Sequence, residues 1–269
     1  MTALTLSVQN DSGAVLASAS GQGEAWLVYE PAYAPGDRLC VACGAPGQFL
    51  ILRLDDALAP GFVFCRDSQY AYPVPFGEAR KVFSSRAFAG ERHCLYVRLA
   101  RPEEIAARKN LALNPWATHE PSGIFPHASA NVETRGEMVF AAKNAIDGMK
   151  ANSFHGEWPY TSWGINRDPE AELTLDFGRD VTIDQLVFTL RADFPHDNWW
   201  KQCTVWFSDG SKITPAFVKT GTRQTIDMAP RTVSWLKIGQ LIKDEDDPSP
   251  FPALTQIEAW GRDSHTHSI

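Results

Sequence analysis

Two short segments of the sequence combine aromatic rings with hydrogen-bonding side chains. The first spans residues 152–163, and the second spans residues 191–201, directly after an apolar run of β-type residues. The apolar face of a sugar ring packs on an indole, while its hydroxyl groups need donors and acceptors at fixed angles. We therefore expect these segments to bind a carbohydrate, and the candidate ligand-binding residues are His155, Trp158, Arg191, Asp193, His196, Trp199 and Trp200.

Each polar candidate offers a different bonding capacity. Arg191 can donate two parallel hydrogen bonds, Asp193 can accept two, and a histidine can do either. The alternative is that the tryptophans of these segments close the end of a β-sandwich. Adjacent residues of an extended strand face opposite ways, so one of Trp199 and Trp200 is expected to be exposed.

Carboxylates in the same segments leave an enzymatic alternative open. Glu157, Asp193 and Asp197 include candidates for the carboxylate pair of a glycoside hydrolase. The same groups equally suit recognition of sugar hydroxyls, and the sequence has no G-x-S-x-G or H-E-x-x-H motif. We therefore expect a binding protein without catalysis. A protein–protein recognition module is the further alternative.

The elements that would position these segments are short and rich in β-branched and aromatic residues. Turns containing Gly, Pro and Asp recur between them, which predicts β-sandwiches rather than an α/β fold. Asp209-Gly210 predicts a hairpin. The tryptophans expected in strand cores are Trp206, Trp235 and Trp260.

One stretch, residues 101–109, predicts a helix instead. It has Pro102 at its start, acidic residues in its first turn and basic residues in its last, which suits the helix dipole. A domain boundary is therefore expected near residue 108. The predicted organisation is an N-terminal β-sandwich of unknown role (1–108), a second β-sandwich (109–262) and a flexible tail (263–269).

Several motifs of the second half occur in the order of a known family. They are Asn110-Leu111-Ala112-Leu113, Asn144-Ala145-Ile146-Asp147-Gly148, Leu175-Asp176-Phe177-Gly178, Phe207-Ser208-Asp209-Gly210 and Ile257-Glu258-Ala259-Trp260-Gly261. This ordered set resembles the discoidin or coagulation-factor type C domains, which include the family 32 carbohydrate-binding modules of the galactose-binding-like fold. The resemblance implies an eight-stranded antiparallel jelly-roll that binds sugars through loops at one end.

The resemblance also implies a structural calcium ion. Carried onto this chain, Asp147 and Glu258 would be carboxylate ligands, and Asn144 and Asn152 would add further oxygens. A mixed shell of carboxylate, amide and carbonyl oxygens suits Ca²⁺. The alternative is that Asp147 only serves the turn before Gly148, and sodium or water would fit the same place.

Composition and charge exclude some classes of binding partner and predict the cellular location. The 269 residues carry 25 Lys+Arg against 32 Asp+Glu, a net charge of −7, so we expect no nucleic-acid partner. The longest uncharged apolar run, residues 39–52, contains glycines and proline, so no membrane partner is expected. The start lacks a signal-peptide pattern, which predicts a cytoplasmic protein with reduced cysteines. Homo-oligomer formation stays open.

Overall fold

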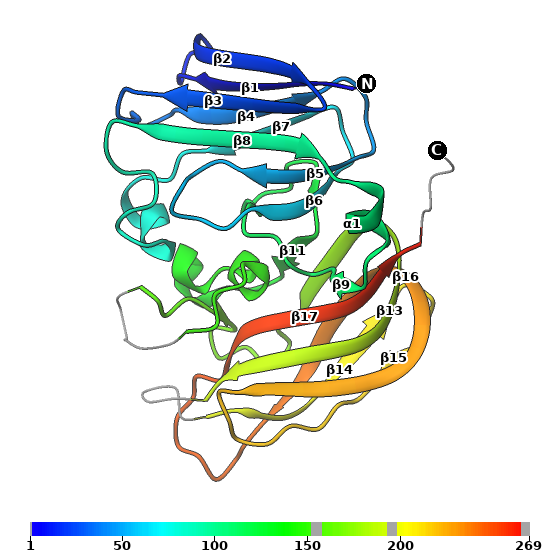
Figure 1. Cartoon of the computed structure of the whole chain (residues 1–269). Coiled ribbons are helices and arrows are strands. Elements are labelled where there is room, and N and C mark those ends of the chain that lie inside the picture. The colour runs from blue at the N-terminus through cyan, green and yellow to red at the C-terminus, as the bar shows by residue number, and fades with distance from the viewer. Residues whose placement is uncertain (1, 152–157, 193–197, 265–269) are drawn as a thin grey trace.

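The computed structural model describes residues 2–151, 158–192 and 198–264 of the chain. Antiparallel strands make up most of its regular structure, with the N-terminal sheets above the C-terminal sheet in Figure 1. The all-β fold class predicted from the short apolar runs is thus confirmed. Within the described ranges, no helix has the length and apolarity that crossing a membrane requires.

The N-terminal strands form two antiparallel sheets around one hydrophobic core. One sheet has the order β2-β1-β4-β7 and the other β10-β6-β5-β8-β3. The strands are β1 (Ala3–Gln9), β2 (Val15–Gln22), β3 (Glu24–Tyr29), β4 (Arg38–Cys43), β5 (Gln48–Arg53), β6 (Gly61–Cys65), β7 (Gln69–Pro73), β8 (His93–Leu99) and β10 (Ile124–Phe125). In β4, alternate residues Leu39, Val41 and Cys43 are buried, as a strand with one face on a core requires.

A short helix, α1 (Pro102–Ala106), follows β8 where a helix was predicted, but it ends before Arg108 and Lys109 and has no basic residue in its last turn. The Glu104 carboxylate accepts a hydrogen bond from the backbone N–H of Arg101 at 2.7 Å. It also accepts two from the Arg98 guanidinium, at 2.6 and 2.5 Å, and that guanidinium lowers the pKa of Glu104 to about 2. The helix start is thereby bonded to β8 of the first sandwich.

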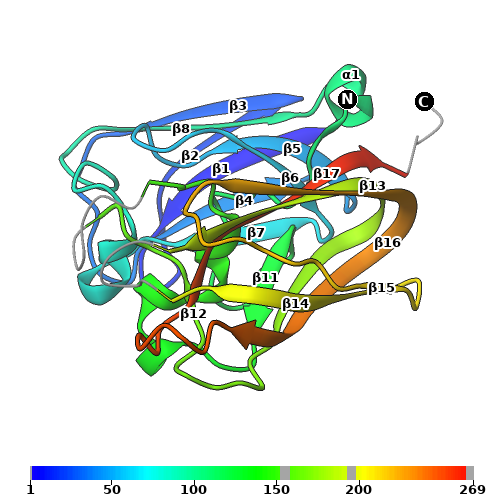
Figure 2. The same ribbon diagram turned by 90° about the horizontal axis from the view of Figure 1, so that it is seen from below.

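The C-terminal strands form one eight-stranded antiparallel sheet that bends into a second sandwich. Its order is β12-β17-β13-β16-β14-β15, with β11 paired to β13 and β9 paired to β17. The strands are β9 (Lys109–Asn110), β11 (His127–Ala130), β12 (Trp163–Gly164), β13 (Leu173–Arg191), β14 (Trp200–Phe207), β15 (Lys212–Ile213), β16 (Arg223–Lys243) and β17 (Ala253–Asp263). Figure 2 shows β16 curving strongly, so that it contributes to both layers.

The bend in β13 has a local cause. The register between β13 and β16 shifts between Asp176 and Val181, and Gly178 lies in this break with a φ of +69°. A Cβ at Gly178 would stand 2.3 Å from the Phe125 ring. Only glycine combines this backbone conformation with such a close approach.

Tryptophans of the second sandwich divide between core and surface differently from the prediction. Trp163 and Trp200 are fully buried, with ring centroids 6.0 Å apart. Trp235 is 38% exposed, and Trp206 and Trp260 are half-buried. The core assignment of these three was wrong, because membership of a strand does not say which face meets the core.

The segment after α1 contributes to both sandwiches. Leu111 and Ala112 belong to the C-terminal core. Trp116 belongs to the N-terminal core, where its ring meets Tyr72 edge-on at 5.7 Å. The turns η2 (Thr134–Gly136), η3 (Met138–Phe140) and η4 (Ala142–Ile146) follow, and η1 (Gly77–Val82) lies in the first half of the chain. The domain boundary near residue 108 stays a prediction, and most of the predicted tail lies outside the described residues.

Candidate functional site

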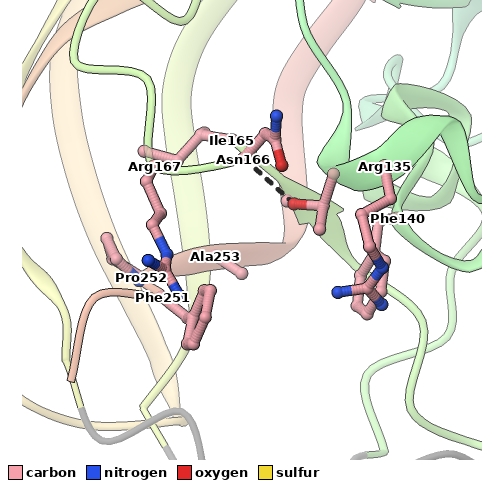
Figure 3. Close-up of a pocket in the computed structure, with 10 residues that line it drawn as sticks. Arg135, Phe140, Ile165, Asn166, Arg167, Phe251, Pro252 and Ala253 are labelled. Carbon is pink, nitrogen blue, oxygen red and sulfur yellow. Dashed lines mark hydrogen bonds between the residues drawn. The ribbon is translucent and has the colours of Figure 1, made fainter.

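Three loops surround a pocket of about 190 Å³ at one end of the C-terminal sandwich (Figure 3). Its walls come from the η2–η3 segment, the turn after β12 and the start of β17. The described residues that line it are Thr134, Arg135, Phe140, Gly164, Ile165, Asn166, Arg167, Phe251, Pro252 and Ala253. Ala253 pairs with Arg191 in the sheet, so the second predicted loop starts at the same end of the sandwich.

The backbone of this pocket is held in an uncommon conformation. Arg135, Asn166 and Arg167 have φ values of +53°, +50° and +63°. The Asn166 N–H donates to Thr134 Oγ1 at 3.0 Å, which fastens the turn after β12 to η2. Left-handed backbone costs a non-glycine residue on the order of 1–3 kcal/mol and is concentrated at functional sites. Three such residues around one small hollow mark it as a candidate binding site.

Two arginines lie on opposite sides of the hollow in Figure 3. The Arg135 guanidinium lies 5.4 Å from the Phe140 ring centroid and donates to both carboxylate oxygens of Glu137, at 2.6 and 2.8 Å. Arg167 is exposed and its guanidinium lies 4.5 Å from the Phe251 ring centroid. Within the described ranges no carboxylate lies within 4.0 Å of Arg167. This guanidinium can therefore donate to a ligand oxygen without giving up an ion pair.

A buried asparagine shapes the loop that carries Phe251. Asn198 is fully buried, and its Nδ2 atom lies 3.2, 3.3 and 2.5 Å from the backbone oxygens of Asp244, Asp247 and Ser249. A buried amide gives up contact with water only when partners of this kind replace it. Asn198 therefore ties the approach to β17, and with it Phe251, to the start of β14.

The predicted ligand residues occupy different environments. Arg191 is 1% exposed, donates to the backbone oxygen of Tyr160 and lies against the Tyr160 ring. Trp200 lies in the core and is 2% exposed. The ligand role of both residues stays a prediction. Trp199 is half-buried, and its indole donates to Asp244 at 3.3 Å. Trp158 is 37% exposed. The remaining candidates, His155, Asp193 and His196, lie outside the described residues.

Hydrogen-bond donors face most oxygens of the predicted calcium ligands that the structure describes. The Gln256 side-chain amide donates to the Asn144 backbone oxygen at 2.5 Å and to Asp147 Oδ1 at 2.7 Å. Its oxygen accepts from the Gly148 N–H at 2.9 Å. Asp147 Oδ1 also accepts from the Met149 N–H at 2.7 Å. An amide group thus faces the two oxygens that the prediction gave to the metal.

Glu258 is likewise supplied with positive charge. Its carboxylate lies 2.5 Å from Lys150 Nζ and 3.0 Å from an Arg223 nitrogen, and it accepts from the Trp260 indole at 2.7 Å. Within the described ranges, no three His, Cys, Asp or Glu side chains are grouped as metal ligands. Hydrogen-bond donors thus face the oxygens of Asp147, Glu258 and the Asn144 backbone, which disfavours Ca²⁺ there, whereas the buried Asn144 Oδ1 has no hydrogen-bond partner among the described residues. The calcium ion stays a prediction. Asn152, the remaining predicted ligand, lies outside the described residues.

Chelation tests this network directly. The Gln256 amide is bonded to Asn144 and Asp147, so we expect no bound ion to add to the free energy of unfolding. The melting temperature in 5 mM EDTA should therefore match that in 5 mM CaCl₂ within about 1 °C. Differential scanning calorimetry measures both. A Ca²⁺-dependent rise of several degrees would show that an ion displaces the amide.

Comparison with known proteins gives no match to a family model or to a curated protein. Solved structures do match, and the following three are carbohydrate-binding modules. Chitosan-binding module 1 of a Paenibacillus sp. IK-5 chitosanase/glucanase is 19% identical, covers 57% of this chain and 99% of its own, and has a TM-score of 0.38. The family 32 module of C. perfringens NanJ, solved with galactose, is 17% identical, covers 49% of this chain and 91% of its own, and has a TM-score of 0.38. A Streptococcus pneumoniae fucose-binding module is 12% identical, covers 58% of this chain and 96% of its own, and has a TM-score of 0.41.

These identities lie below 25% and these TM-scores below 0.5. We therefore take the fold class from the strand order of this chain and the candidate site from its own geometry. The class that this geometry defines is an antiparallel β-sandwich with a loop-built pocket at one end.

Proposed function

We propose that the chain is a non-catalytic carbohydrate-binding protein that takes a sugar in the pocket between Arg135, Asn166, Arg167 and Phe251. The observation that carries the proposal is the Arg167 guanidinium, which is exposed at the pocket with Phe251 beneath it. Guanidinium N–H groups donate to hydroxyl, ring or carboxylate oxygens, and the neighbouring aromatic and proline surfaces accept the C–H face of a pyranose.

The composition of the pocket wall supports binding over hydrolysis. Among the described residues that line it none is Asp or Glu, and Glu157, Asp193 and Asp197 of the enzymatic alternative lie outside the described residues. Cleavage of a glycosidic bond uses a pair of carboxylates on either side of that bond. Recognition needs only fixed donors and an apolar surface, and this wall offers both. A volume near 190 Å³ suits one sugar unit, with further units extending over the exposed rim.

Two substitutions test the site by isothermal titration against D-galactose, L-fucose, D-glucosamine and D-glucuronate. We expect Arg167→Ala to weaken the sugar that binds best by tenfold or more, because one charge-assisted hydrogen bond is worth about 1.5–3 kcal/mol. Phe251→Ala removes the apolar surface below the guanidinium and should weaken binding to a similar degree. Both side chains lie at the surface or half-buried, so the fold should persist.

Arg92→Ala is the matched control. Arg92 is an exposed arginine of the first sandwich, paired with Glu30 at 3.2 Å, and it should leave the affinity unchanged. Equal affinities in Arg167→Ala, Phe251→Ala and the parent protein would place the sugar elsewhere.

A further inference from the structure

A second cavity, of about 400 Å³, lies where the first sandwich meets the turns that open the second. One wall is the end of β7 with η1, and the other is the segment 117–122 with η3 and η4. In Figure 1 these turns lie beside η1 at one side of the molecule. The cavity shares no lining residue with the pocket around Arg167. Crevices between packed units are frequent places for small-molecule binding.

Most of the cavity wall is apolar. The side chains that supply this surface are Tyr72, Val74, Pro75, Phe76, Phe83 and Met138. A sugar in such a place would leave most of its hydroxyl groups without partners, at a cost of about 1–3 kcal/mol each. The wall instead suits a flat hydrocarbon body.

One buried cation interrupts the apolar wall. Lys143, on η4, lines the cavity and is only 7% exposed. Its ammonium lies 5.3 Å from the Phe83 ring centroid. No hydrogen bond or ion pair links this ammonium to any other described residue. A buried ammonium without a directly bonded partner is costly, and an anion in contact with it lowers that cost.

Carboxylates near Lys143 are engaged with other groups. Glu133 accepts from the Ala142 N–H at 2.8 Å and pairs with His119 at 2.8 Å. Glu120 is 86% exposed and lies 3.4 Å from the other nitrogen of the His119 ring. Asp147 accepts from Gln256 and Met149. The cavity thus presents an ammonium with no described carboxylate within 4.0 Å, and the charges of Asp147 and Glu133 act on it from farther away, where they oppose the lowering of the Lys143 pKa by burial.

We infer that this cavity binds a small amphipathic carboxylate, with its acid group on Lys143 and its apolar body against Phe83, Tyr72 and Phe76. The ligand would place a negative charge in direct contact with the ammonium and bury its hydrocarbon face in the same step. This site is independent of the proposed sugar site, because the two share no residue.

A pair of isosteric probes, naphthalene-1-acetate and naphthalene-1-acetamide, tests the inference by isothermal titration. We expect the acid to bind at least tenfold more tightly than the neutral amide, because only the acid meets the ammonium with opposite charge. Lys143→Met keeps the apolar length of the side chain and removes the charge. It should abolish the preference for the acid and leave the melting temperature equal or higher.

Lys81→Met is the matched control, because Lys81 lies on η1 near the cavity but pairs with Glu78 outside its wall. It should bind both probes as the parent protein does. Equal affinities of acid and amide, no binding of either, or an unchanged preference in Lys143→Met would each overturn the inference. None of these results bears on the Arg167 pocket, whose own variants and sugars decide it.

Discussion

Trp200→Ala is expected to lower the free energy of unfolding by about 3–5 kcal/mol, the usual cost of removing a large aromatic side chain from a core. Trp200 is 2% exposed and packs against Trp163 at 6.0 Å between ring centroids. Cavity formation and lost transfer free energy both contribute, since few neighbours can move into the space. Urea denaturation followed by circular dichroism measures the difference.

Trp158→Ala is the control for Trp200→Ala. The Trp158 side chain is 37% exposed, so its removal should cost no more than about 1 kcal/mol. Equal stability of Trp200→Ala and the parent protein would contradict the core position of Trp200. It would restore the surface role that the pairing of two tryptophans in a loop had suggested.

The free energy of unfolding is expected to depend on pH through Asp147. Burial raises the pKa of Asp147 from 3.8 to about 7, although hydrogen bonds from Met149 and Gln256 and the charge of Lys143 oppose the rise. Between these two values the folded chain keeps a proton that the unfolded chain releases. Stability from this group is therefore fully present below pH 3.8 and is lost as the pH rises through 7, by on the order of 4 kcal/mol.

Asp147→Asn isolates this contribution. The amide oxygen of asparagine can still accept from Met149 and Gln256 but cannot ionise. We expect the variant to be more stable than the parent at pH 8 and closer to it at pH 4, in urea titrations at both values. The opposite order at pH 8 would show that the ionised carboxylate is needed there, as it would be for a bound cation.

Features set by neighbouring residues were predictable from the sequence. The hairpin at Asp209-Gly210 forms as expected, with Gly210 at a φ of +83° and the Phe207 N–H bonded to the Ser211 oxygen at 2.9 Å. The helix after Arg101 depends on Pro102 and the acidic residues of its first turn, all within a few positions. Turns and helix caps depend on residues that are close together in the sequence.

Features that depend on residues far apart in the chain could not be predicted from the sequence. The sequence predicts a ligand contact for Arg191 and Trp200 because they occur in an aromatic, polar stretch, and it did not reveal that both side chains are buried. The Gln256 amide lies 109 positions along the chain from Asp147, and the spacing of ligand types could not reveal that it faces that carboxylate. Strand register alone brings such groups together.

The pocket residues were also missed. Asn166 and Arg167 belong to a short turn before Pro169, and Phe251 stands between two prolines. Each is an ordinary loop signal, and only the fold brings the two loops together. A polar turn and a proline-flanked aromatic ring were the available signals, and neither specifies a partner.

Binding of a sugar in the pocket lined by Arg135, Asn166, Arg167 and Phe251 can be followed residue by residue in ¹H–¹⁵N correlation spectra during titration with D-galactose, L-fucose, D-glucosamine and D-glucuronate. We predict that at least one sugar shifts backbone amide signals of residues 134–140, 164–167 and 251–253 in a saturable way. The N-terminal sandwich should stay unchanged. Spectra that stay constant with all four sugars, or saturable shifts confined to other residues, would contradict the claim.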